Sequence, residues 1–221
     1  PALKRHLYGI DLLRFAAAAL VLLNHFALFG WAAPDGSARG GAAAFPLLSP
    51  FAGTGAIGVQ IFFVISGFVI TMSTIGMRPA DFVRHRLIRI LPTLWICAVI
   101  ALAARLAYGE PAVELAGAFL RSIMLSPKGP YIDGVVWTLV VEAVFYGLVF
   151  VAMLRNAGRG MDAMAVVLAL ASAAFLSLHT MAIVFDLTAA GGRLDSLLDR
   201  FPFKVLLLRH GVFFSAGMLL F

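Results

Sequence analysis

Two long apolar stretches without charge constrain this chain more than any other feature. Residues 53–76 contain no charged side chain, and residues 163–185 contain none apart from His179. An α-helix rises about 1.5 Å per residue and the hydrocarbon core of a bilayer is about 30 Å thick, so each stretch can cross it. Charged residues make up only 13% of the chain, about half the share typical of soluble domains. The sequence therefore predicts a polytopic membrane protein of the all-α class.

The apolar runs between charged residues predict about six spans in a single transmembrane helix bundle. They cover residues 10–29, 55–75, 90–106, 135–154, 163–185 and an incomplete run from about 205. Residues 111–125 have acidic and basic side chains close by, so we expect an interfacial or re-entrant helix there. The last apolar run stops at residue 221 without a polar tail, and we expect one domain over residues 1–221 that is truncated at its C-terminus.

Basic residues gather in three short segments between the predicted spans. These segments hold Lys4 and Arg5, then Arg78, Arg84, Arg86 and Arg89 in a predicted loop, and then Arg155 and Arg159. Short loops rich in Lys and Arg stay on the cytoplasmic side, so we expect a cytoplasmic N-terminus. The same clustering accounts for the net charge of +6, and we exclude nucleic acid as a partner.

The stretch "IDLLRFAAAALVLLNHF", residues 10–26, carries charged groups inside an apolar run. Arg14 and His25 are 11 residues apart, which at about 100° per residue is three turns plus about 20°, so they share one helix face about 16 Å apart. Asp11 lies near that face and can pair with Arg14. A charge near the bilayer centre costs roughly 2.5 to 3.5 kcal/mol. Two interpretations stay open: an anchored helix end with a packed histidine, or a polar path through the membrane.

Glu142 lies about one third of the way into the fourth predicted span from its outer end. A lone carboxylate at that depth should face the interior of the bundle. Its depth is similar to that of His25, so the two can share a cavity. An imidazole with a carboxylate in reach suits general-base work on a hydroxyl, because imidazole takes up a proton near neutral pH. The alternative is a buried His–Glu or Glu–Arg pair that only fixes helix packing.

Other polar residues near the spans have structural interpretations as well as functional ones. Ser66 and Gly67 are typical of a close contact between membrane helices. The guanidinium groups of the second basic segment suit the phosphates of a cytoplasmic ligand, although a topology signal and lipid headgroup contact explain them equally well. Cys97 is expected to be a buried, inert thiol, and His179 to be structural.

Five separated stretches together resemble acyltransferase family 3, the integral membrane acyltransferases that modify cell-surface sugars and related acceptors. Residues 10–26 resemble the first helix of that family, with an arginine, ten intervening residues and a histidine. "GVQIFFVISGFVIT" is similar to its second-helix signature, "HRLIRILP" to its arginine-rich loop, "WTLVVEAVFY" to its Trp-x-Leu-x-x-Glu motif and "FFSAGMLLF" to a later helix. Two positions depart from the family pattern: His85 replaces one of two paired arginines, and Ala143 replaces the second of two glutamates. Family members usually have about ten spans, so we expect further helices in the full protein.

The resemblance implies transfer of an acyl group, most often acetyl, from cytoplasmic acyl-CoA to a hydroxyl of an extracytoplasmic or lipid-linked glycan. Lipopolysaccharide and exopolysaccharide of the cell envelope are acceptors of this class. It further implies an O-acetyltransferase type of activity with acetyl-CoA as donor substrate and no metal. The implied location is the bacterial inner membrane, and the implied partners are the glycan acceptor and the bilayer.

Carried onto this sequence, the resemblance assigns roles to three groups of residues. The catalytic group has His25 as general base on the acceptor hydroxyl, Glu142 as the residue that orients it or stabilises its charged form, and Arg14 at the donor entrance. The residues expected to hold the phosphates of CoA are Arg84, Arg86 and Arg89. The residues expected to line the substrate channel are Asp11, Ser66, Trp137 and Tyr146.

Two other classes of function remain open from the residues alone. Arginine, histidine and glutamate inside a membrane also build proton and ion pathways, so a proton-coupled transporter is the main alternative. A nonenzymatic membrane scaffold with buried ion pairs is the other. A transporter would move its substrate without acyl chemistry, and a scaffold would tolerate replacement of its charges by matched polar residues.

Overall fold

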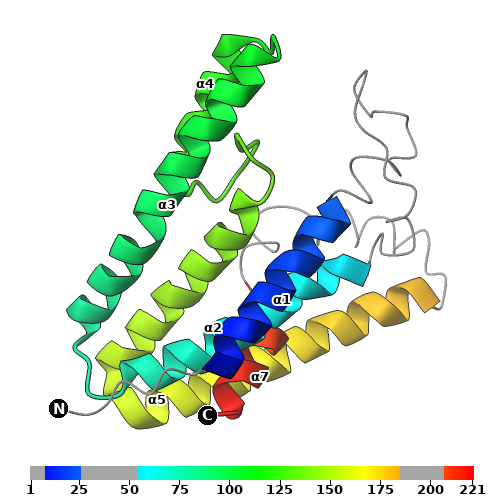
Figure 1. Ribbon diagram of the computed structural model, residues 1–221. Helices are drawn as coiled ribbons and strands as arrows, with labels where there is room; N and C mark the ends of the chain where they lie inside the picture. The colour runs from blue at the N-terminus through cyan, green and yellow to red at the C-terminus, as the bar shows by residue number, and fades with distance from the viewer. Residues whose placement is uncertain (1–7, 26–53, 185–206) are drawn as a thin grey trace.

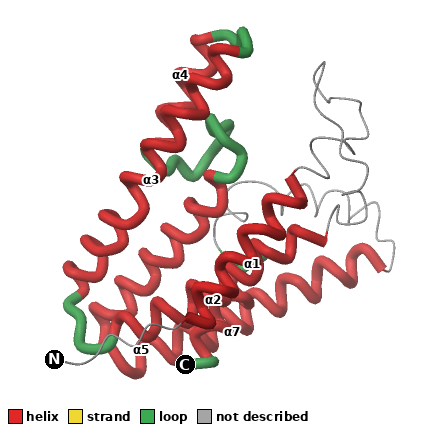
Figure 2. Tube along the Cα trace, in the orientation of Figure 1, coloured by secondary structure: helices red, strands yellow, loops and turns green. Residues whose placement is uncertain are grey.

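The computed structural model describes residues 8–25, 54–184 and 207–221, and all regular structure in these ranges is helical. The elements are α1 (Tyr8–Asn24), η3 (Thr54–Ala56), α2 (Ile57–Thr74), α3 (Pro79–Ala107), α4 (Ala112–Ile123), α5 (Val136–Val184) and α7 (Gly211–Leu219). Figures 1 and 2 show them as a bundle with no strand in the described part of the chain. The prediction of an all-α fold is confirmed for these residues.

Four helical segments are long and apolar enough to cross a membrane. They are Ile57–Thr74, Pro79–Ala107, Val136–Arg155 and Gly160–Met181. The predicted count of about six spans is not confirmed: α1 has 17 described residues and α7 has 9, and both are shorter than these four. The remaining residues of the first predicted span, 26–29, and the start of the last, 205–206, lie outside the described residues. The chain is thus an integral membrane protein with at least four candidate spans.

The predicted loop of basic residues between the second and third spans is wrong. Helix α3 begins at Pro79 and runs for 29 residues, so Arg84, Arg86 and Arg89 lie on its first turns. Proline is favoured at the start of a helix, where its missing amide hydrogen has no partner to lose. At about 1.5 Å per residue the helix is about 43 Å long, more than the hydrocarbon thickness, so its basic end can extend into the headgroup region.

Helix α5 contains two predicted spans in one continuous helical segment of 49 residues. Figure 1 shows that the segment bends sharply in the middle, so its two arms diverge and both lie against the rest of the bundle. A Cβ atom on Gly160 would lie 2.9 Å from the carbonyl oxygen of Ala152. Because glycine has no side chain, it permits this close approach of the two arms at the bend.

The predicted non-spanning helix at residues 111–125 is confirmed as α4, whose 12 residues reach only about 18 Å. It packs antiparallel to the end of α3, where Trp95 donates a hydrogen bond from Nε1 to the carbonyl oxygen of Ile123 at 3.2 Å. Ala98, Leu115 and Ala118 form a small apolar core between the two helices. This end of the molecule projects beyond the other helices (Figures 1 and 2).

Helix α2 packs closely against two partners through glycines. A Cβ on Gly58 would lie 2.6 Å from the carbonyl oxygen of Ala17 in α1. On the opposite side, a Cβ on Gly67 would overlap the carbonyl oxygen of Phe214 in α7, and a Cβ on Gly217 would overlap that of Val64. The close helix contact predicted at Gly67 is therefore confirmed, and the backbone of α2 is fixed between α1 and α7.

We expect Gly67→Ala to destabilise the full-length protein by about 2 kcal/mol, because the new methyl group meets a backbone atom that cannot rotate away. Thermal unfolding in detergent micelles measures the change. Gly147→Ala is the matched control, since nothing lies within 4 Å of a Cβ there and alanine favours a helix. Equal unfolding temperatures for Gly67→Ala and the wild type would contradict the close contact.

Candidate active site

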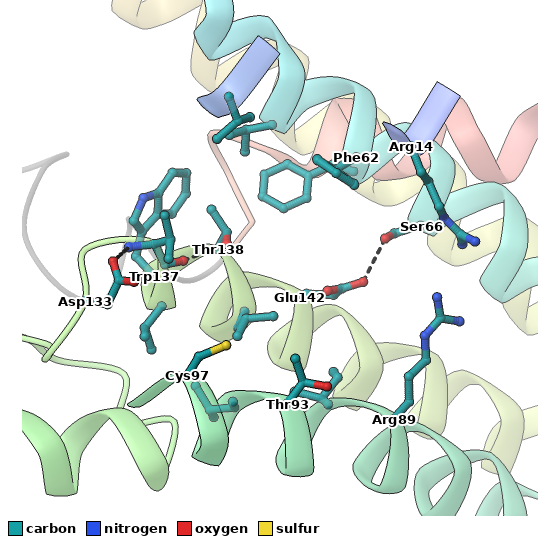
Figure 3. A pocket seen from close by; sticks show the side chains of 18 of the residues that line it. Arg14, Phe62, Ser66, Arg89, Thr93, Cys97, Asp133, Trp137, Thr138 and Glu142 are labelled. Atoms are coloured by element: carbon teal, nitrogen blue, oxygen red, sulfur yellow. Dashed lines mark hydrogen bonds between the residues drawn. The ribbon is translucent and has the colours of Figure 1, made fainter. Parts of the chain in front are cut away.

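A cavity of about 670 Å³ lies between α1, α2, α3 and the first arm of α5. Its walls are mostly apolar, and its polar lining includes most of the residues that the sequence analysis selected: Arg14, His25, Ser66, Arg86, Arg89, Trp137, Glu142 and Tyr146. Figure 3 shows arginines at one end of this cavity, Trp137 and Asp133 at the other, and Glu142 between them. The structure therefore brings residues from four helices to one shared cavity.

Glu142 is the centre of a hydrogen-bonded cluster in the middle of the cavity. Ser66 in α2 donates to Glu142 Oε1 at 2.7 Å, and Tyr146 in α5 donates to the same oxygen at 2.6 Å. Hydrogen bonds to an ionised acceptor are shorter and stronger than those between neutral groups. These three residues, which we call the Glu142 cluster, link α2 to α5 within the membrane. The sequence did not show that Ser66 has a carboxylate beside it.

Three arginines surround the Glu142 cluster from the end where α1 and α3 begin. Arg14 and Arg89 point into the cavity from opposite walls (Figure 3), and Arg14 lies within electrostatic reach of both Arg89 and Glu142. Arg86 donates to Ser73 Oγ at 2.7 Å, and its guanidinium lies 5.8 Å from the ring centre of Tyr146. Three positive charges beside one carboxylate make this end of the cavity suited to an anion.

Helix phase explains why two selected residues lie outside the cavity lining. Arg84 is two residues before Arg86, about 200° around α3, so its side chain is exposed on another face. Arg89 is three residues after Arg86, about 300° around the helix, so it lies near the face of Arg86 and also lines the cavity. Asp11 is a turn before Arg14 with a side chain that is 62% exposed, and it pairs with Arg14 at 3.6 Å. Asp11 therefore acts on the cavity only through Arg14.

His25 lies at the other end of the described part of α1 and also lines the cavity. Its Nδ1 is 2.7 Å from the carbonyl oxygen of Val21. A carbonyl can only accept, so Nδ1 carries the hydrogen and the neutral ring has its lone pair on Nε2. His25 and Glu142 share the cavity, as expected from their depth, but the described residues contain no hydrogen bond between them.

Two lining residues were missed or misjudged from the sequence. Asp133 precedes the fourth predicted span and was not selected; it lies in the loop before α5, where Oδ1 accepts a hydrogen bond from the Val135 amide, and it lines the cavity together with Trp137. The prediction that Cys97 is buried is wrong: its side chain is exposed and lines the cavity, because few helices cover α3 there. Within the described ranges, no group of three or more His, Cys, Asp or Glu residues is placed to hold a metal ion.

Comparisons with known proteins show the family of the chain. The sequence profile of the family described as "Acyltransferase domain" matches residues 7–221. The chain is 32% identical over 116 residues to the exopolysaccharide production protein ExoZ of Rhizobium meliloti (strain 1021). That alignment covers 46% of this chain and 36% of the relative, so the chain spans only about a third of that protein. No solved structure matches the chain.

We expect a double-mutant cycle to show that Ser66 and Glu142 stabilise each other. The single variants Ser66→Ala and Glu142→Leu and their combination, measured by unfolding of the full-length protein in detergent, should give a coupling energy of about 1 kcal/mol. Ser122→Ala is the control partner for Glu142→Leu, because Ser122 bonds to Ala118 and Ile132 instead. Additive effects in both cycles would contradict the hydrogen bond.

Proposed function

The chain belongs to the acyltransferase family whose profile matches residues 7–221, and we propose that it transfers an acyl group, most often acetyl, from acyl-CoA to a hydroxyl of a surface polysaccharide. The observation that carries this proposal is one cavity that three arginines line at one end and that His25 lines about 16 Å further along α1. The printed name of the relative, an exopolysaccharide production protein, supports a polysaccharide acceptor.

The arginine end of the cavity is the proposed donor site. Arg86 and Arg89 come from one face of α3 and Arg14 from α1, so they can approach the phosphates of CoA from two sides. Planar guanidinium groups bind phosphate through paired hydrogen bonds. Arg84 lies outside the lining and is left out of the proposed donor site.

The spacing of Arg14 and His25 along α1 is close to the length of an extended CoA arm. Arg14 and His25 are about 16 Å apart along α1. The arm of CoA between pyrophosphate and sulfur has about twelve bonds, comparable to about four extended residues or roughly 14 Å. With its phosphates at the arginines, the arm would cross the apolar middle of the cavity and bring the thioester close to His25.

The proposed chemistry is direct transfer with His25 as general base. Nε2 takes the proton of the acceptor hydroxyl while the hydroxyl oxygen attacks the carbonyl carbon of the thioester. The tetrahedral intermediate then expels the CoA thiolate, which takes up the proton from the imidazolium. Glu142 bonds to Ser66 and Tyr146, so we assign it to balancing the arginine charges and holding α2 against α5.

The proposed orientation has the arginine end at the cytoplasmic face of the bacterial inner membrane. Helices α1 and α3 begin at this end, and α3 begins with a basic segment. Basic segments next to spans favour the cytoplasmic side, where acyl-CoA is made. His25 and Trp137 would then face the outer half of the membrane, from which an extracytoplasmic or lipid-linked glycan can enter.

We expect His25→Ala to lower acetyl transfer at least about 100-fold, because general-base catalysis contributes roughly this much or more. Membranes with equal amounts of full-length wild type or variant receive radiolabelled acetyl-CoA, and label on glycan is counted. His179→Ala is the control, since His179 lies outside the cavity lining and should keep wild-type labelling. Equal labelling by His25→Ala would exclude His25 as the base, and no labelling by the wild type would overturn the proposed function.

We expect acetyl-CoA to protect Cys97 from a thiol-reactive maleimide, because the thiol lies on the cavity wall between the two ends. Mass spectrometry of the peptide that contains Cys97 measures the alkylation rate. The double variant Arg86→Gln, Arg89→Gln should raise the acetyl-CoA concentration needed for half-maximal protection at least about tenfold, because charge-assisted hydrogen bonds to the donor are lost. Arg84→Gln is the control and should be protected like the wild type. Equal protection in all variants would place the donor elsewhere.

A further inference from the structure

The end of the cavity opposite the arginines has an aromatic wall. Trp137 lies in the first turn of α5 and lines the cavity. His210 packs against its ring at 5.4 Å between centroids with 37° between the planes, and Phe63 meets it edge-on at 6.4 Å and 78°. These contacts with two other segments hold the indole in one orientation at the cavity surface.

Trp137 and Asp133 leave polar atoms available at this wall. In the part of the chain that the structure describes, no hydrogen bond is made by the Trp137 indole nitrogen, which is not fully buried. Asp133 accepts a hydrogen bond from the Val135 amide through Oδ1 at 3.1 Å, which helps to begin α5, and Oδ2 has no partner among the described residues. The wall thus combines an apolar ring face, one donor and one acceptor.

The loop that carries Asp133 is held in place by the α3–α4 end of the molecule. Ser122 accepts the Ile132 amide at 2.8 Å, and Arg105 donates to the Ile132 carbonyl at 2.9 Å. Tyr131 donates from its hydroxyl to the Ser126 carbonyl at 2.8 Å, and burial raises the pKa of Tyr131, so this donor stays protonated. Because the loop is already fixed, it loses little conformational entropy when a ligand binds.

The arginine end and the Asp133 end of the cavity differ in charge, so they suit different ligands. Asp133 disfavours an anion at its end, so the phosphates of the donor belong with the arginines. A purely apolar ligand would make no hydrogen bond to Asp133 or to the indole nitrogen. A neutral sugar ring fits both the apolar ring face and the polar atoms of this wall. Its C–H face packs on the electron-rich face of an indole, and its hydroxyls donate to a carboxylate.

We infer that Trp137 and Asp133 form the acceptor subsite, in which one pyranose ring of the glycan stacks on the indole and donates a hydroxyl hydrogen bond to Asp133 Oδ2. This inference rests on the proposed function and names the residues that select its acceptor. His25 lines the same cavity, so the proposed base and the bound sugar share one space.

Kinetics with two substrates test the subsite on the purified full-length protein in lipid nanodiscs. The donor is acetyl-CoA, and the acceptor is surface polysaccharide from the producing cells after alkaline removal of its acyl groups. We expect Trp137→Leu to raise the acceptor KM at least about tenfold while the acetyl-CoA KM changes less than about twofold. Trp137→Phe should restore most of the acceptor affinity, and Asp133→Asn should weaken it several-fold.

Trp95→Leu is the matched control, because Trp95 bonds to Ile123 on the α3–α4 side and does not line the cavity. Both KM values should stay at the wild-type level. An unchanged acceptor KM in Trp137→Leu, an equal rise in both KM values, or equal losses in Trp137→Leu and Trp137→Phe would overturn the sugar subsite. If the wild type transfers no acetyl group to the treated polysaccharide, the proposed function fails and the subsite fails with it.

Discussion

The cost of placing charge in hydrocarbon is the constraint on which this structure depends. Arg86, Arg89 and Glu142 lie in candidate spans, and Arg14 lies in α1, which packs against one of them; an unpaired charge in hydrocarbon is expensive. The fold meets this cost by turning them toward one shared cavity, where carboxylate and guanidinium groups offset one another and hydroxyl groups supply hydrogen bonds. Their apolar neighbours on α3 can face lipid without penalty, because lipid tails are as apolar as the side chains themselves.

The position of helix α2 determines where several residues of that cavity lie. Glycines on two sides let α1 and α7 contact its backbone, so it can neither rotate nor slide without a clash. Ser66 is next to Gly67 on this helix, and its hydroxyl is therefore delivered to Glu142 by backbone packing. Phe63 on the same helix stacks on Phe214 at 4.6 Å and also meets Trp137, so one rigid element positions the middle and one end of the site.

Patterns within one helix were predictable from the sequence, and contacts between helices were not. The spacing of Arg14 and His25 gave their common face, because helix geometry fixes it. The hydrogen bond from Ser66 to Glu142 joins residues 76 apart, and no local pattern contains it. The basic segment was misread as a loop because charge was taken as the end of a helix, whereas α3 has 29 residues and is longer than the hydrocarbon core is thick. Cys97 was misread because the exposure of α3 depends on which helices cover it.

The two ends of the cavity are built from different parts of the chain. The arginines stand on α1 and α3, while Asp133 belongs to a loop fixed by Arg105 and Ser122 from the α3–α4 end. A change in that loop can alter one wall without moving the charged residues inside the membrane. Such an arrangement is modular. Under the proposed function, chimaeras that exchange the segment from α4 to the start of α5 would change the acceptor and keep the donor, so one scaffold would serve many different surface glycans.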